Sequence, residues 1–477
     1  MVSKSLTNNQ LGLILMDSNI DNFPFKNSTW LSAWTKKFCS ATVLYQAGIH
    51  KRSGHSAYWL LQLFLALRFS NSDVYRFQGE DNPLPERSAF YDFLAQKRYN
   101  WEYLVFTVAR QIIAFFSQLT TPRGDRVLIL DDSSYKRNRS KKVELLGRHH
   151  DHNDNTFYKG FRMLTLAWSD GHSLVPLGFE LLSNAAKEKR IGAIPDYDGR
   201  THFGKRCKRA TQKTVDVASS MIDWMVDTKG VTADYLVCDS WFSFPSHVKA
   251  LSTHLPVVCM LKDLPSISFL HGKRIYQLKS LYEKVNNRKR GKAFTGSPII
   301  GSITVQMLNG PKIRVVFVRD SRTPGQWLAI ASTDLTITPE RICRIYAKRW
   351  AIEVFFKQTK QELGLASEVE VRSYAAVIAH TSIVYLRYMM LAYYRRQQTD
   401  DKTIPGLFHA FSEELKTMSM QLCLQIIRLE LVELLSGKGY DQLCGQVVEL
   451  FSHFYDRHPM LSGYSIELQC LTANPES

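Results

Sequence analysis

The chain has 477 residues, of which 45% are hydrophobic and 12% aromatic, so it is long enough for several globular domains and at least one large core. Lysine and arginine outnumber aspartate and glutamate by 61 to 44, and the formal net charge of +17 favours a polyanionic partner such as DNA or RNA. The eight cysteines include no C-x-x-C pair, which argues against a zinc ribbon and against a disulfide scaffold.

Secretion and membrane insertion are not expected from the sequence. The first residues lack the apolar core and cleavage site of a signal peptide. The apolar stretch 59–67 is too short to span a bilayer, and the stretch 375–394 is interrupted by His380 and Arg387. We therefore expect a soluble, cytoplasmic protein.

Residues 1–120 are predicted to be mainly helical. Apolar residues recur every three or four positions in 57–69 and in 101–119. The segment 82–88 is expected to be a loop that leads into another short helix, with Ser88 as the N-cap of that helix.

After the turn residues 121–124, the hydrophobic pattern changes to that of an α/β core. The predicted elements are strands at 127–130, 161–168 and 173–182, a helix at 212–228 and a strand at 235–238. The first strand is predicted to end in Asp131-Asp132 and the last to end in Asp239. This order of elements, with acids after the first and fourth strands, is typical of a ribonuclease-H-like layout.

A β-rich segment follows this core. Further strands are predicted at 257–261, 302–308, 313–318 and 326–331. Asn309-Gly310 is the turn of a hairpin, because this dipeptide accepts the positive φ angles that tight hairpin turns need.

The rest of the chain is predicted to be helical. Thr338 is expected to cap a helix that has Pro339 in its first turn and ends at Gly364. Later helices are clearest at 375–396 and 421–435.

The helix that begins at Thr338 carries the most informative set of side chains, which are Tyr346, Arg349, Glu353 and Lys360. At about 100° per residue, these four fall within roughly 60° of arc on one helix face. Such a face offers an acid that can hold a cation, two bases that can hold phosphates, and a phenol, which suits phosphodiester chemistry. The alternative is a solvated face with an i,i+4 ion pair such as Arg349 with Glu353.

Asp132, Asp239 and Glu353 are the candidate catalytic and metal-ligating residues. A pair of Mg²⁺ ions about 3.5–4 Å apart needs carboxylate oxygens that converge from separate elements. Adjacent strand residues point to opposite faces, so Asp131 remains an alternative to Asp132, which we prefer because Ser133-Ser134 follow it. An acid after an apolar strand is also common as the simple start of a turn.

Basic runs flank these acids at 136–142, 200–213 and 288–292. Each run alone is typical of a solvated loop, but together they favour phosphate contacts that position DNA without reading its sequence. The run His149-His150-Asp151-His152 is expected to be an exposed polar loop rather than a zinc site, because consecutive histidines rarely converge on one ion.

The spacing Tyr-x2-Arg-x3-Glu-x6-Lys resembles the signature of the bacterial DDE transposases of insertion-sequence family four, whose members move DNA by cut and paste. The four signature residues match it position by position. Asp132 with the following serines resembles the first acid of the family. Cys238-Asp239-Ser-Trp-Phe resembles the second, although many members carry Arg or Lys there. The resemblance covers about residues 125–365.

The resemblance implies a transposase that cuts an insertion sequence out of DNA and inserts it elsewhere. It implies nicking by two-metal phosphoryl transfer with Mg²⁺, for which Mn²⁺ can substitute, followed by a hairpin intermediate and strand transfer. Tyr346, Arg349 and Lys360 would grip phosphates around a flipped base, and Trp327 would stack on that base. The implied partner is double-stranded DNA, as terminal inverted repeats and as target, bound by a homodimer at the bacterial nucleoid.

Three regions are expected in this α/β chain. Residues 1–120 would be a helical DNA-end-binding region. Residues 121–368 would be a ribonuclease-H-like DDE catalytic core with a β-rich insertion at about 263–335. Residues 369–477 would be a helical region that serves dimerisation.

Two other functions are compatible with parts of this sequence. A ribonuclease-H-like nuclease would cut DNA with the same acids but would not join it. An inactive DNA-binding regulator derived from a transposase would be expected to lack one acid or part of the signature, and neither loss is seen.

Overall fold

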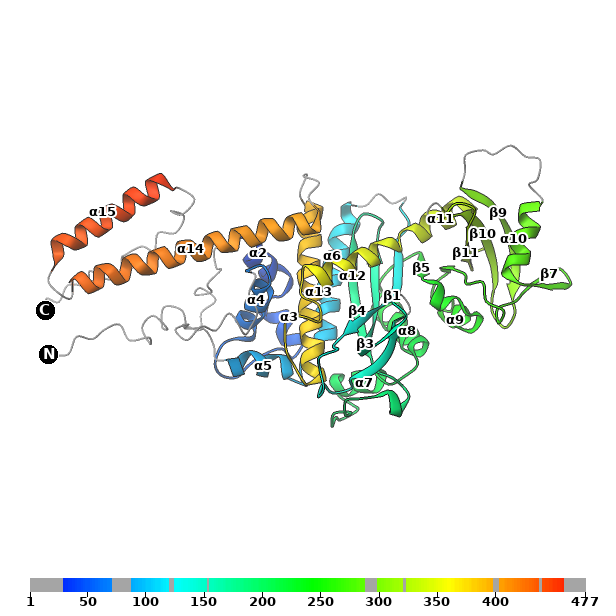
Figure 1. Ribbon diagram of the computed structural model, residues 1–477, viewed down its shortest axis with the longest axis horizontal. Coiled ribbons are helices and arrows are strands. Elements are labelled where there is room, and N and C mark those ends of the chain that lie inside the picture. The colour runs from blue at the N-terminus through cyan, green and yellow to red at the C-terminus, as the bar shows by residue number, and fades with distance from the viewer. Residues whose placement is uncertain are drawn as a thin grey trace. The chain divides into compact units, whose positions relative to one another are not determined.

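The computed structural model describes residues 29–70, 87–119, 124–151, 154–287, 298–320, 323–397, 403–436 and 440–458. The chain forms two compact units (Figure 1). The first takes its described residues from 1–37, 51–88 and 405–477, and the second takes them from 38–50 and 89–404. Each unit is described separately below.

The first unit is helical and has an aromatic core. Its helices include α2 (Thr29–Phe38) and α4 (Ala57–Leu67), and α14 (Ile404–Ser436) and α15 (Asp441–Arg457) follow later in the chain. The ring of Trp30 stacks on Phe411 at 4.1 Å and meets the edge of Phe69. The helix predicted at 57–69 is confirmed by α4, which begins after Ser56, whose side chain accepts a hydrogen bond from the Trp59 N–H.

The second unit is built around one mixed sheet of eleven strands, in the order β2-β3-β1-β5-β6-β11-β10-β9-β7-β8, with β4 paired to β3. The strands are β1 (Val127–Lys136), β2 (Gly147–Asp151), β3 (Thr156–Ser169), β4 (Leu174–Leu182), β5 (Tyr235–Cys238), β6 (Val257–Met260), β7 (Phe269–His271), β8 (Arg274–Tyr276), β9 (Ile299–Met307), β10 (Lys312–Arg319) and β11 (Trp327–Ser332). The α/β fold class is therefore confirmed.

Helices connect these strands and cover the sheet. They are α3 (Ala41–Gln46), α5 (Arg87–Ala95), α6 (Trp101–Leu119), α7 (His202–Arg209), α8 (Thr214–Asp223), α9 (Pro245–Leu251), α10 (Leu278–Asn287), α11 (Pro339–Ala347), α12 (Trp350–Gln361) and α13 (Tyr374–Gln397). The π-helical turn η3 (Trp224–Thr228) continues α8, and the short 3₁₀ helix η4 (Ser240–Ser243) follows β5. Ser88 lies inside α5 rather than at its N-cap, which corrects the predicted start of this helix.

β1 lies near the middle of the sheet and is longer than its apolar residues predict. It pairs antiparallel with β3 along all ten residues and parallel with β5, which in turn pairs parallel with β6. The sequence predicted that the strand ends at Asp131-Asp132, but it continues to Lys136 because cross-strand pairing with β3 continues there. The two acids are therefore held by a regular strand and not by a turn.

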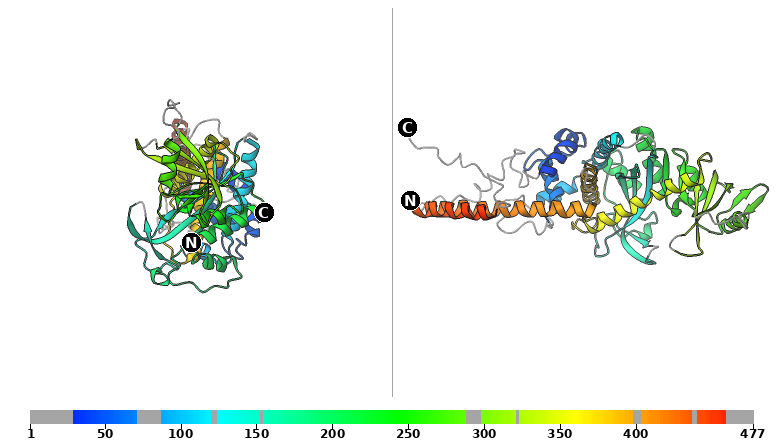
Figure 2. Two further views of the ribbon diagram at one scale, coloured as in Figure 1. Left: turned by 90° about the vertical axis from the view of Figure 1, so that its right-hand side faces the viewer. Right: turned by 90° about the horizontal axis from the view of Figure 1, so that it is seen from above.

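The β-rich segment extends the same sheet beyond β6 (Figures 1 and 2). β11 pairs antiparallel with β6, with Ala331 opposite Cys259. The hairpin of β9 and β10 is confirmed, and Asn309 in its turn has a φ of 60°. Continuous strand pairing thus connects the sheet that carries the acids to the segment that carries Trp327.

α13 is the central covering helix of the second unit. It packs against α6 and β4, and it is the one helix in the described part of the chain that is long and apolar enough to cross a membrane. Its apolar window is entirely buried, as expected for the core helix of a folded domain. The buried Arg387 in this helix donates hydrogen bonds to the Glu368 carboxylate at 2.6 and 2.7 Å, and His380 contacts the same carboxylate at 2.8 Å.

The signature segment forms two helices instead of the one that was predicted. Thr338 does cap α11, and Gly364, with a φ of 77°, follows the end of α12. Between them, the amides of residues 348, 349, 351 and 352 bond three residues back instead of four. Tyr346 therefore lies on α11, Arg349 lies at the junction, and Glu353 and Lys360 lie on α12.

Candidate active site

The face of β1 that carries Asp131 is covered by α12 and α13. Thr165, directly opposite Asp131 on β3, makes a 2.7 Å hydrogen bond with the hydroxyl of Tyr385 in α13. On the same face, the Lys360 Nζ of α12 donates to the Ser133 hydroxyl at 2.7 Å. Because side chains alternate along a strand, Asp131, Ser133 and Thr165 share this face, and Asp132 lies on the other.

Arg349 connects Asp131 to Glu353. One Arg349 nitrogen lies 3.0 Å from a carboxylate oxygen of Asp131, and the other terminal nitrogen is ion-paired with Glu353. Asp131 and Arg349 are 218 residues apart in the sequence, so only the tertiary fold brings them together. The side chains of Asp131 and Glu353 are 10% and 36% exposed, so this centre opens toward solvent at Glu353.

Asp132 is engaged by a different cation on the opposite face. Arg162 of β3 donates from two nitrogens to the two Asp132 oxygens, each at 2.6 Å. The Arg162 guanidinium also lies 3.9 Å from the ring centre of Trp241. The choice between Asp131 and Asp132 as the first catalytic acid stays a prediction. Asp131 shares Arg349 with Glu353, whereas Asp132 pairs with Arg162 and is close enough to Asp239 to raise the pKa of that acid.

Asp239 lies next to Asp131 because β1 and β5 run parallel. Leu130 is opposite Cys238, so the residues that follow them, Asp131 and Asp239, emerge side by side at the end of this pairing. Asp239 caps η4, and its carboxylate accepts a 2.6 Å hydrogen bond from the Trp241 N–H. Asp131 and Asp239 thus lie at neighbouring positions of the sheet, and both Asp131 and Asp132 interact electrostatically with neighbouring acids of this cluster.

The electrostatics of these acids reflect their crowding. Burial raises the pKa of Asp131 well above its ordinary range, nearby Asp132 and Asp239 raise it further, and Arg349 opposes the shift. Burial also raises the pKa of Asp239, the Trp241 N–H opposes that rise, Asp132 adds to it, and Arg349 and Lys262 counteract it. Four carboxylates with two arginines in direct contact make a site that favours additional positive charge.

Of the remaining signature residues, Tyr346 contacts Arg349, whereas Lys360 lies farther along α12 and contacts Ser133. The Tyr346 ring centre lies 5.7 Å from the Arg349 guanidinium, and burial raises the pKa of the Tyr346 hydroxyl. Partial desolvation lowers the pKa of Lys360, and the nearby Lys136 lowers it further. Sequence spacing alone did not reveal Arg162, which belongs to no motif and pairs with Asp132.

Trp327 is the first residue of β11, a strand that packs against α11. Its ring stacks on Tyr282 of α10 with centroids 4.5 Å apart and planes 11° from parallel, and its edge meets Phe317. The side chain is partly exposed. This aromatic stack is a flat apolar platform, and base stacking on Trp327 remains a prediction.

The basic runs have mixed structural roles. In the run 200–213, Arg206 and Arg209 form buried or half-buried ion pairs with Glu180, so these two cations stabilise the fold instead of facing a ligand. Residues 288–292 lie outside the described residues. The run 136–142 lines a groove that is considered further below.

The histidine run is part of β2 and is not a loop as predicted. His149 stacks on Tyr158, and burial together with Arg162 lowers the pKa of His149 to about 4. His150 contacts the Asn155 side chain at 3.1 Å. His152 lies outside the described residues. These contacts give His149 and His150 structural roles.

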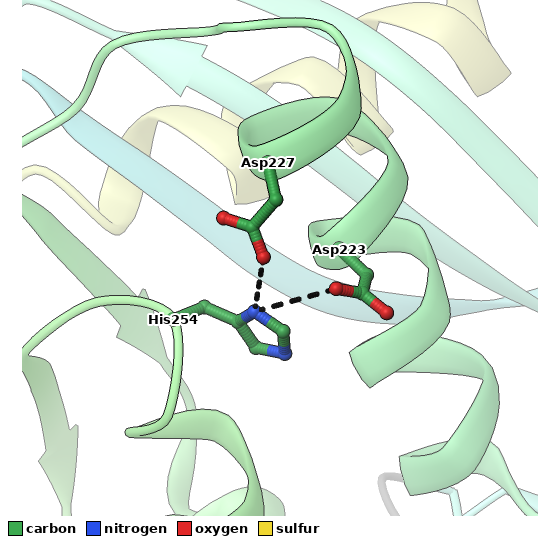
Figure 3. Close-up of side chains that lie close together, drawn as sticks. All are labelled: Asp223, Asp227 and His254. Carbon is green, nitrogen blue, oxygen red and sulfur yellow. Dashed lines mark hydrogen bonds and ion pairs between the residues drawn. The ribbon is translucent and has the colours of Figure 1, made fainter.

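Within the described residues, one group of three side chains has ligand atoms within 4.8 Å of one another and could hold a metal ion, and it includes none of the four acids above (Figure 3). Asp223 and Asp227, from α8 and η3, both face the Nδ1 of His254, at 3.8 and 3.1 Å. Both carboxylates approach the same ring nitrogen and are mostly exposed, so polar contacts with His254 account for this arrangement.

The second unit is a mixed α/β sheet with carboxylates on strand β1 and just after the neighbouring strand β5, which is consistent with a DDE nuclease fold. Residues 83–298 match the family model described as "DDE superfamily endonuclease". The match covers fewer than half of the residues, includes Asp131, Asp132 and Asp239, and ends before Glu353. It supports a DDE-type nuclease or transposase, an enzyme class that acts on DNA and uses divalent metal ions. No curated protein matches the chain.

Proposed function

We propose that the protein is a DDE transposase of insertion-sequence family four, which cuts and joins DNA with Asp131, Asp239 and Glu353. The observation that carries this proposal is that Arg349 contacts both Asp131 and Glu353, which supports grouping the acid of the signature helix with the acids of β1 and β5. The strand order β4-β3-β1-β5-β6, with β3 antiparallel and β5 and β6 parallel, supports a ribonuclease-H-like core.

The carboxylates fit divalent metal ions. Hard cations such as Mg²⁺ bind carboxylate oxygens, and this centre holds more carboxylates than contacting arginines. Asp131, Asp239 and Glu353 would hold two Mg²⁺ ions, with Mn²⁺ as a substitute. When bound, the ions would supply an activated water and stabilise charge on the attacking and leaving oxygens.

The protein side chains around the acids would position the DNA. Arg349 and Lys360 are cations on the same side of β1, and Tyr346 contacts Arg349, so these three would hold phosphates next to the cleaved bond. Asp132 would act through Arg162, by holding that cation against Trp241 close to Asp239. Trp327 would stack on a base turned out of the duplex.

The order of reactions follows from the family resemblance. A nick at the element end frees a 3′ hydroxyl, which attacks the opposite strand to form a hairpin. Hairpin opening and strand transfer into target DNA follow. We propose terminal inverted repeats as the recognised ends, a homodimer on DNA, and a cytoplasmic location at the bacterial nucleoid. The expected regions at 1–120, 121–368 and 369–477 remain part of this proposal.

The experiment is to incubate purified protein with DNA that carries the ends flanking its own gene and Mg²⁺, and to resolve the products on a denaturing gel. Hairpin and strand-transfer products are expected. Simple cleavage alone would identify a nuclease that does not join DNA, and binding without cleavage would identify an inactive regulator.

Glu353→Gln tests the assigned site, because the substitution removes the carboxylate charge but changes the volume of the side chain very little. We expect cleavage to fall at least about 10³-fold, which corresponds to the roughly 4 kcal/mol expected for loss of a metal ligand. DNA binding should stay within about twofold. Cleavage at a near-normal rate by this variant would refute the assigned site.

A further inference from the structure

A strongly basic groove lies where β1 and α12 leave the candidate active site. It has a volume of about 580 Å³, and its two walls are the loop 136–143 and the segment 366–372. The first wall continues directly from β1 and the second follows α12. The hydrogen bond between Lys360 and Ser133 joins the same two elements shortly before each wall of the groove begins.

Arg137 holds the two walls together. Its guanidinium donates to the carbonyls of Ala366, Val369 and Val371 at 3.2, 2.9 and 3.4 Å. Ala366 has a φ of 66°, a conformation that residues other than glycine adopt only when their surroundings impose it. Glu144 adds a second connection, because its N–H donates to the Arg372 carbonyl at 2.9 Å.

The groove carries positive charge that the protein does not neutralise. Arg139, Lys141, Lys142 and Arg372 are exposed, and none forms an ion pair within the described part of the chain. Glu370 is the one acid among the described lining residues. Lys136 differs from these four, because it is paired with Asp151 and Asp154 at 2.9 and 3.0 Å.

We propose that this groove is a binding subsite for the phosphate backbone of a DNA strand that passes through the active site. The identification of DNA as the ligand rests on the proposed function. The lining is made of long flexible cations rather than a rigid constellation of donors, so the groove would hold phosphates without reading bases. In this proposal, Arg137 has the structural role of joining the two walls. The phosphates are contacted by Arg139, Lys141, Lys142 and Arg372.

The test is a metal-free binding measurement with the full chain. Arg139, Lys141, Lys142 and Arg372 are all changed to Gln, which retains most of the side-chain length and breaks no described ion pair. Fluorescence anisotropy with a labelled duplex of mixed sequence, in EDTA, is recorded as a function of salt concentration. Each lost phosphate contact lowers the slope of log K against log salt by about 0.9 for a duplex, so a decrease of roughly 3.6 is expected. Affinity near 0.1 M salt should fall more than tenfold, equally for unrelated sequences.

A control variant separates the groove from net charge. Changing Lys249, Lys273, Lys279 and Lys312 to Gln removes the same charge from exposed positions outside the groove. This variant should keep most of the slope. Equal losses in both variants, or an unchanged slope in the groove variant, would overturn the subsite.

Failure of the groove proposal and failure of the proposed active site give different experimental results. Binding in EDTA does not require Asp131, Asp239 or Glu353 to hold a metal. If Glu353→Gln cleaves normally while the groove variant loses binding, the assigned active site fails and the groove stands. If the groove variant binds normally while Glu353→Gln loses cleavage, the groove fails and the active site stands.

Discussion

Two arginine-centred clusters in the second unit use the same groups in opposite ways. In the Arg387 cluster, Glu368 is enclosed by Arg387 and His380, and all three side chains are at most 1% exposed. In the Arg349 cluster, one guanidinium is shared between Asp131 and Glu353, and the side chains are 10–36% exposed. The first cluster gives one acid two cationic or polar partners, whereas the second gives two acids one cation.

The pKa shifts express this difference. Burial would raise the pKa of Glu368, but Arg387 and His380 outweigh burial and lower it to about 2. At Asp131, burial and the neighbouring acids outweigh Arg349 and the pKa rises. A buried acid whose charge is paired by protein groups stabilises the fold. Partly exposed acids that outnumber their protein cations are suited to binding a cation from solution.

The largest expected effect separates the two adjacent acids of β1. Asp131→Asn should lower DNA cleavage by at least about 10³-fold, since it removes a proposed metal ligand. Asp132→Asn should lower cleavage by no more than about tenfold, because it only weakens the hold on Arg162. Both rates are measured on the same DNA substrate in Mg²⁺. A larger loss for Asp132→Asn would return the catalytic assignment to Asp132.

The next prediction compares the clusters by stability. Arg387→Met leaves Glu368 buried without its main counter-charge, which should cost about 3–5 kcal/mol and lower the melting temperature by roughly 10 °C. Arg349→Met should cost about 1 kcal/mol or less, because Glu353 is 36% exposed and Asp131 still accepts a hydrogen bond from the Asp132 N–H. Thermal unfolding measures both variants. Equal losses would remove the distinction between the two clusters.

Acid should weaken the Arg387 cluster. Burial lowers the pKa of His380 in the folded protein below that of a histidine in the unfolded chain. As the pH drops below about 6.5, the unfolded chain therefore takes up a proton that the folded protein does not, and the free energy of unfolding falls. The Glu368 contribution is complete above pH 4.5 and is lost as the pH falls toward 2, for a total of about 3 kcal/mol. Denaturant titrations across this range provide the measurement. Glu368→Gln should remove the lower part of the dependence, and an unchanged profile would count against this pairing.

The smallest expected effect concerns Trp327, whose side chain is partly exposed. Trp327→Ala should slow hairpin formation about tenfold and the first nick less, because a stacked base contributes roughly 1–3 kcal/mol. Trp327→Phe retains an aromatic face and should behave nearly as wild type. Single-turnover kinetics resolve the two steps. Equal slowing of nicking and hairpin formation would show that Trp327 acts through its packing on Tyr282 and Phe317 instead.

Much of the secondary structure could be predicted because its signals are local. The nineteen-residue helix α6 and the strand β5 have the predicted bounds, and the Asn309-Gly310 hairpin follows from turn chemistry alone. The extension of β1 past the acids could not be predicted, because its polar residues give no apolar signal and β3 stabilises the strand by pairing.

The sequence by itself determined the Tyr-Arg-Glu-Lys spacing, the acids that follow two apolar runs and the strong positive charge, because these are properties of residue order and composition. Only the tertiary structure decided that Asp131 faces Glu353, that Arg162 holds Asp132 and that Arg137 closes a basic groove. Alternation along a strand requires adjacent acids to diverge, but which of them faces the site depends on which helix covers each face. That is settled by contacts between residues more than two hundred positions apart.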